Sequence, residues 1–149
     1  MPFTPPTTAA SQANTGYLAQ FLLGSPPAAI AEIKSFSLDP ISMSEVSTTH
    51  LLSQSNTEEF IPSLIKPGKC SASGNFIGAS SQLTITTLAQ AQTIFAFQIV
   101  APVYRNTKTY TFTAAGFIAG YKLGPFENNK ALEFSVDIQI TGAYTEVVA

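Results

Sequence analysis

A strict alternation of apolar and polar side chains near the C-terminal end limits the folds open to this sequence more than any other feature. Five polar residues there alternate with four apolar ones: Glu133, Ser135, Asp137, Gln139 and Thr141 against Phe134, Val136, Ile138 and Ile140. Successive side chains of a β-strand point to opposite faces, so the pattern predicts a strand with one buried face. The threonines from Thr107 to Thr113 alternate with Tyr110 and Phe112 in the same way. Both stretches predict half-buried antiparallel strands.

Turn-forming residues divide the rest of the chain into further strands. We expect breaks at Gly24-Ser-Pro-Pro27, Asp39-Pro40 and Lys66-Pro-Gly68, because proline and glycine interrupt regular strands. The expected strands cover residues 16–24, 30–38, 43–51, 69–77, 93–103, 107–121 and 132–144. The predicted fold class is therefore mainly β, an antiparallel β-sandwich or barrel of about seven strands with one flanking α-helix.

That helix is expected between residues 80 and 92. Ser80 or Ser81 would cap its N-terminus, and one helical stripe would carry Leu83, Thr87, Leu88 and Ala91. The β-branched run at 84–87 favours a strand instead. We expect a helix because Leu-Ala-Gln-Ala-Gln follows this run and a break must precede the next strand.

Charged side chains are scarce. Seven Lys and Arg and nine Asp and Glu make up 11% of the 149 residues, against about 25% in ordinary soluble domains. Intrinsic disorder and a dense basic nucleic-acid surface are excluded by this composition, and a disulfide scaffold is excluded by the single cysteine, Cys70. Long strands with few charges to protect their edges predict that other subunits cover part of the surface.

Residues for catalysis or metal binding are few. His50 is the only histidine and Cys70 the only cysteine, so neither has a partner at ligand spacing. The sequence contains no Gly-x-Ser-x-Gly elbow and no phosphate-binding loop. We therefore expect no enzyme activity, no metal and no cofactor.

We expect residues 1–15 to form a flexible N-terminal arm and residues 16–149 a single domain; the arm is either a frayed terminus or a segment that orders on a neighbouring subunit. The Pro- and Thr-rich start has no periodicity with which to bury apolar surface. No apolar run approaches the roughly 18 residues of a membrane span, and no Lys or Arg precedes Lys34, so we expect neither membrane insertion nor a secretion signal.

An ordered set of segments resembles the major tail tube protein family of long-tailed bacteriophages. These segments are Ile33–Leu38 with Glu45–His50, Thr57–Leu64, Phe95–Phe97, Tyr110–Phe112 and the closing Phe134–Gly142. Ser63 replaces a glycine that is usual in the family. The resemblance implies a β-sandwich with a flanking helix, and a structural virion protein whose six-membered rings stack into a hollow tail tube for DNA ejection.

The resemblance also implies partners and a location. These are other copies of the chain, a tape-measure protein in the lumen, tail-tip and tail-terminator proteins, and passing double-stranded DNA that is not bound specifically. The protein would be assembled in the host cytoplasm and belong to the virion tail.

Two groups of site residues follow from the resemblance. The segment from Pro40 to Pro67 would be a long loop contacting the next ring, with His50, Leu51, Leu52, Glu58, Glu59, Phe60 and Ile61 as candidates; an ordinary surface loop is the alternative. The lumen would be lined by Glu32, Glu133 and Asp137, with Glu32 on the strand face of Lys34; an outer solvated face is the alternative.

The sequence leaves two other functions open. One is the inner tube of a contractile injection device, from which no sequence feature separates a non-contractile tail. The other is a glycan-binding β-sandwich of a phage tip, which would favour exposed aromatic residues and tryptophan. The sequence contains no tryptophan.

Overall fold

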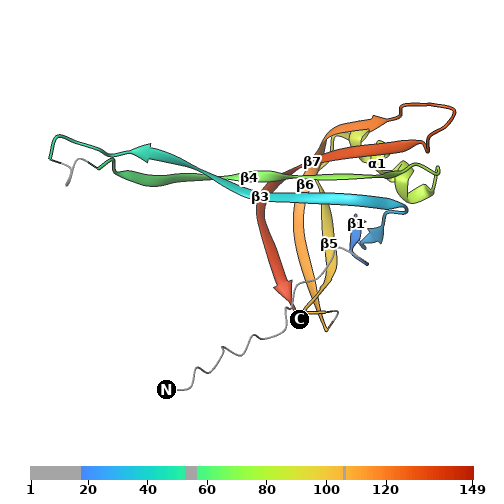
Figure 1. Cartoon of the computed structure of the whole chain (residues 1–149), viewed down its shortest axis with the longest axis horizontal. Helices are drawn as coiled ribbons and strands as arrows, with labels where there is room; N and C mark the ends of the chain where they lie inside the picture. The colour runs from blue at the N-terminus through green and yellow to red at the C-terminus, as the bar shows by residue number, and fades with distance from the viewer. Residues whose placement is uncertain (1–17, 53–56, 106) are drawn as a thin grey trace, which may run out of the picture.

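The computed structural model describes residues 18–52, 57–105 and 107–149 (Figure 1). The predicted N-terminal arm, residues 1–15, lies outside them. The elements in chain order are β1 (Gln20–Leu23), β2 (Ala28–Ala29), β3 (Ile33–Ser47), β4 (Phe60–Asn75), α1 (Ser80–Ala91), β5 (Phe95–Val103), β6 (Lys108–Leu123) and β7 (Glu133–Val148). The predicted fold class is confirmed: the chain is mainly β, with seven antiparallel strands and one helix.

The seven strands form one sheet in the order β2-β1-β5-β6-β7-β4-β3, and all neighbouring strands are antiparallel. The pairing of β6 with β7 shifts register twice, and such bulges let strands bend. In Figure 1 the sheet curls over, with α1 beside its upper end. The two ends of the sheet meet where the Phe21 ring of β1 lies 6.3 Å from the Phe36 ring of β3.

The core lies inside this curl. A row of rings crosses it from Phe21 through Phe97 and Phe112 to Tyr144, with centroids 6.0, 6.1 and 5.1 Å apart in turn. The apolar residues of the C-terminal alternation, Phe134, Val136, Ile138 and Ile140, are all buried. The alternation therefore identified the core face of β7 correctly.

Two predicted breaks are wrong. β3 continues through Asp39-Pro40 and joins the second and third predicted strands, while β4 begins at Phe60 and continues through Lys66-Pro-Gly68. The physical reason is that β3 is an edge strand and the first part of β4 pairs with β3 alone. A proline in either place can direct its nitrogen, which has no N–H to donate, to the side where no strand pairs. The strand count of seven holds because the two-residue β2 replaces the lost strand.

The helix forms as predicted, but its cap and its buried face differ. Ala79 is the N-cap residue without a side-chain hydrogen bond, and the buried residues are Gln82 and Ile85, while Leu83 is half exposed. The Gln82 amide explains the change. Its Nε2 donates to the carbonyls of Ala31 and Asn75, and its Oε1 accepts from the Ile77 N–H, at 2.8–2.9 Å.

Candidate assembly surfaces

A two-stranded arm projects from the body of the molecule (Figure 1). β4 pairs with β7 only from Asn75 to Lys69, whereas β3 and β4 pair with each other as far as Ser47 and Phe60. We call residues 39–52 and 57–69 the arm. The segment from Pro40 to Pro67 is therefore not the predicted long loop, because backbone hydrogen bonds between β3 and β4 organise most of it as a ribbon.

Large apolar side chains cover the arm. Nine of them are exposed: Ile41, Met43, Val46, Leu51, Leu52, Phe60, Ile61, Leu64 and Ile65. The register places Met43 beside Ile65 and Val46 beside Ile61. Phe60 and Ile61 are consecutive residues of β4 in regular register with Ser47 and Val46, so their side chains point to opposite faces. Both faces of the arm are thus apolar and open to solvent.

The root of the arm is held tightly. The Gln139 amide of β7 donates to the carbonyls of Pro67 and Gly68 at 3.1 and 2.9 Å, just beyond the last β4–β7 pair. A side chain at Gly68 has no room, because a Cβ there would lie 1.3 Å from the Asp39 carbonyl oxygen of β3. Sequence patterns predicted a break at Gly68 and a polar strand face for Gln139, but not this role. The two residues fix where the arm leaves the body.

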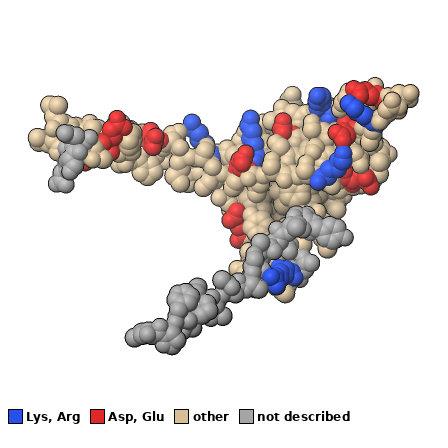
Figure 2. All heavy atoms as spheres, viewed as in Figure 1, with Lys and Arg blue, Asp and Glu red and all other residues tan. Residues whose placement is uncertain are grey.

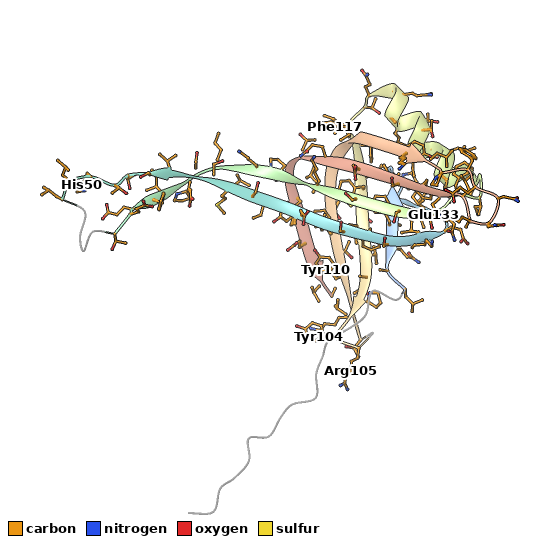
Figure 3. All side chains as sticks on the ribbon, turned by 45° about the horizontal axis from the view of Figure 1, so that its top comes forward. His50, Tyr104, Arg105, Tyr110, Phe117 and Glu133 are labelled. Carbon is orange, nitrogen blue, oxygen red and sulfur yellow. The ribbon has the colours of Figure 1, made fainter. Side chains whose placement is uncertain are left out.

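The predicted inter-ring residues meet at the far end of the arm, where Figure 3 labels His50. The Leu52 N–H donates to His50 Nδ1 at 3.1 Å, and His50 Nε2 lies 3.9 Å from Glu59 Oε2. Since Nδ1 accepts, the neutral ring carries its proton on Nε2, toward Glu59. The Glu59 N–H donates to Thr49 Oγ1 at 2.8 Å. The other predicted inter-ring residues are close neighbours of this network in the sequence: Leu51, Glu58, Phe60 and Ile61.

The predicted lumen residues separate. Glu133 and Asp137 lie on the polar face of β7, with Asn75 and Ser71 of β4 opposite them. Glu32 instead lies in the turn before β3, with a φ of 60°, so it does not share a strand face with Lys34.

The polar face of β3, β4 and β7 is rich in hydroxyl groups. Ser35 and Ser73 hydrogen-bond at 2.9 Å, and Ser71 Oγ donates to Asp137 at 2.7 Å. Lys34 Nζ lies 2.5 Å from Glu133 Oε1, and this hydrogen bond and charge lower the pKa of Glu133. Among the described residues, Asp137 forms no ion pair. We call this surface the hydroxyl face.

The remaining candidates for chemistry do not gather into a site. Cys70 is buried, and desolvation, with a further contribution from the Asp137 charge, raises the pKa of its thiol to about 12. Within residues 18–52, 57–105 and 107–149, no three metal-ligating side chains lie together. In an open groove of about 600 Å³ between β1 and β3, Lys34 is the only titratable side chain among the described residues of the lining. No helix in the described parts is long and apolar enough to cross a membrane.

Comparisons with known proteins support the fold strongly and the family not at all. No protein-family model and no curated protein matches the sequence. Among solved structures, the tail of an empty gene transfer agent particle, refined with C6 symmetry, superposes with a TM-score of 0.74 at 14% identity, covering 91% of this chain and 99% of the other. The chain has the tail-tube fold.

Two further structures show the range of this fold. The tube-terminating cap of the anti-feeding prophage matches over 100% of both chains, with a TM-score of 0.72 and 14% identity. The SPP1 tail tube matches with a TM-score of 0.62 and 13% identity, covering 87% of this chain and 75% of the other. The shared fold thus occurs in tube walls and in caps that end a tube.

Proposed function

We propose that this chain is a non-enzymatic structural subunit of a virus or virus-like tail. Copies of it form six-membered rings, and the rings stack into the hollow tail tube through which DNA passes. The fold likeness to the gene transfer agent tail and the SPP1 tail tube supports this reading.

The single observation that carries this function is the apolar arm. Burying one large apolar side chain is worth about 1.5–3 kcal/mol, and nine such side chains stand exposed on the arm. A soluble monomer rarely exposes so much contiguous apolar surface unless a partner covers it. Because both faces of the arm are apolar, the arm fits between surfaces of other copies in the adjacent ring.

The hydroxyl face is the proposed lining of the lumen. A wall that bound phosphates would retain DNA, because cation–phosphate contacts dominate protein–DNA affinity. The Lys34 charge is neutralised by Glu133, and Asp137 adds a negative charge beside the serine hydroxyls. Glu133 and Asp137 are therefore the lumen residues of this proposal.

The partners follow from the tube. A tape-measure protein would occupy the lumen before the DNA, and tail-tip and tail-terminator proteins would meet the two ends. The subunit would assemble in the host cytoplasm and reside in the virion tail.

A terminator that caps a tube is the second candidate, because the anti-feeding prophage cap matches over the full length of both chains. The two functions differ in growth: a tube subunit adds ring upon ring, whereas a terminator stops as one ring. An inner tube of a contractile device would additionally bind a sheath protein.

The function is tested by changing the end of the arm. The variant Leu51→Ser with Leu52→Ser removes the two most exposed leucines, at 104% and 85% exposure, without touching the core. Leu51→Met with Leu52→Met is the matched control, because it keeps the apolar surface. Sedimentation velocity should show long assemblies for the wild type and the methionine variant and folded, unassembled subunits for the serine variant. Equal assembly of all three would overturn the role of the arm.

A further inference from the structure

The end of the arm is acidic as well as apolar. No Lys or Arg occurs between Lys34 and Lys66, whereas Glu45, Glu58 and Glu59 lie in the outer part of this stretch. Figure 2 shows acidic side chains gathered toward the outer half of the arm. A surface that receives the arm end should therefore combine apolar side chains with positive charge.

The turn between β5 and β6 has this combination. It carries Arg105, the only arginine of the chain, and Lys108, whose Nζ lies 5.0 Å from the centre of the Tyr104 ring. Tyr104 is half exposed, and so are Val147 and Val148 at the neighbouring end of β7. Hydrogen bonds between the backbones of Thr109 and Ala149 hold the two strand ends side by side.

The backbone of this turn is strained. Tyr104 and Arg105 have φ values of 50° and 53°, in the left-handed region that favours glycine. Non-glycine residues held there are costly and gather at functional positions. The turn keeps a large aromatic ring and a guanidinium at the two positions where glycine would be easier to accommodate.

The other cations are occupied or lie elsewhere. Lys34 pairs with Glu133 and Lys130 with Glu127. Lys66 and Lys69 belong to the arm itself, and Lys122 lies next to Ser135 on the sheet face. Glu146, the acid on the neighbouring strand end, accepts a hydrogen bond from the Tyr110 hydroxyl at 3.0 Å. Among the described residues, the β5–β6 turn is thus the one place off the arm where two cations without an ion pair lie together.

We propose that the β5–β6 turn of one copy receives the arm end of a second copy. In Figure 3, His50 marks the arm end, and Tyr104 and Arg105 lie at the foot of the body, well away from it. A contact between two such separated surfaces joins copies head to tail, and head-to-tail contacts build rings or open filaments. This proposal rests on the self-assembly proposed above and adds the surface that receives the arm end.

Charge reversal tests the contact. Chain one carries Glu58→Lys and Glu59→Lys, so its arm end and its turn are both basic. Chain two carries Arg105→Glu and Lys108→Glu, so both of its surfaces are acidic. Each chain alone should need at least about ten times the wild-type concentration to assemble. A 1:1 mixture should assemble at close to the wild-type concentration, because each arm then meets a turn of opposite charge.

A matched control separates this contact from general attraction between oppositely charged chains. Glu32→Lys with Glu127→Lys changes the net charge as chain one does but leaves the arm end and the β5–β6 turn unchanged. It should therefore assemble alone as the wild type does, and labelled chain two should not be incorporated along its assemblies. Circular dichroism shows whether each charge-reversed chain is folded. If one is not, the test is repeated with neutral variants: Glu58→Gln with Glu59→Gln, and Arg105→Gln with Lys108→Gln. If reversals leave assembly unchanged, or if chains one and two fail to rescue each other while the wild type polymerises, the contact is refuted and the tube function stands. If the wild type itself does not assemble, the proposed function fails first.

Discussion

Replacing Gly68 by alanine should loosen the arm at its root while the core stays folded. The new Cβ would lie 1.3 Å from the Asp39 carbonyl oxygen. Carbon–oxygen contacts normally require about 3.3 Å, so β3 and β4 must separate by about 2 Å at this point. No side-chain movement relieves the overlap, because the obstructing atom belongs to the backbone.

The size of the effect follows from the hydrogen bonds near this position. The strand pairs Asp39–Lys69 and Ile41–Pro67 flank Gly68, and the Gln139 amide binds the Pro67 and Gly68 carbonyls. Losing two to four of these bonds, at about 1 kcal/mol each, lowers the free energy of unfolding by about 2–4 kcal/mol. With a urea dependence of about 2 kcal/mol per molar, the unfolding midpoint falls by about 1–2 M.

Urea unfolding below the assembly concentration measures this shift, and limited proteolysis shows whether the arm is released. Gly120→Ala is the matched control, because its Cβ would make an ordinary 3.7 Å contact with Asp137. The control should stay within about 1 kcal/mol of the wild type and assemble normally. If Gly68→Ala matches the control in midpoint, protease resistance and assembly, then the close approach of β3 and β4 at the arm root is wrong.

Three further predictions concern the body. Gln82→Leu should lower the free energy of unfolding by about 3 kcal/mol, measured by urea denaturation, because it removes the hydrogen bonds to three backbone groups around α1; no loss would contradict the role of this buried amide. Cys70 should resist alkylation at pH 8 in the native state and react in denaturant. The free energy of unfolding should fall above about pH 9, because the unfolded thiol ionises there while the folded thiol, with a pKa of about 12, stays protonated. Lys34→Met should raise the pKa of Glu133 in an NMR titration, because the lysine hydrogen bond and charge lower it; in the wild type, the favourable effect of this pair is present above the unfolded pKa and is lost as the pH falls through the lowered folded one.

The strands of the curled body could be predicted because their side chains alternate. In β7, every second residue from Phe134 to Ile140 is buried, and that period follows directly from strand geometry. Tyr110 and Phe112 of β6 lie on the core side in the same way. The helix was also predictable, since a strand had to end before β5 could begin.

The arm could not be predicted, because its prolines suggested breaks. Pro40, Pro62 and Pro67 stand in strand segments that are paired on one side only, and only the three-dimensional pairing shows which segments these are. The apolar residues of the arm do not alternate with polar ones as in a strand with one buried face, so their pattern is typical of a loop. The aliphatic pair Leu64-Ile65, between Pro62 and Pro67, was the one signal of an extended exposed ribbon.

Two glutamines that hold the structure together also escaped prediction. Gln82 bonds across 51 residues to Ala31, and Gln139 across 71 residues to Gly68. Such contacts depend on how distant segments meet, which local patterns do not contain. The same limit applies to the β5–β6 turn, whose exposed ring and cations gain meaning only beside the arm.

Electron microscopy of the purified wild-type protein at increasing concentration tests the central claim most directly. Self-assembly through the arm into a tail tube predicts hollow tubes of indefinite length with a regular ring repeat and six-fold end views. Single closed rings that never lengthen would indicate the terminator function instead. A particle that stays monomeric at every concentration would contradict the account.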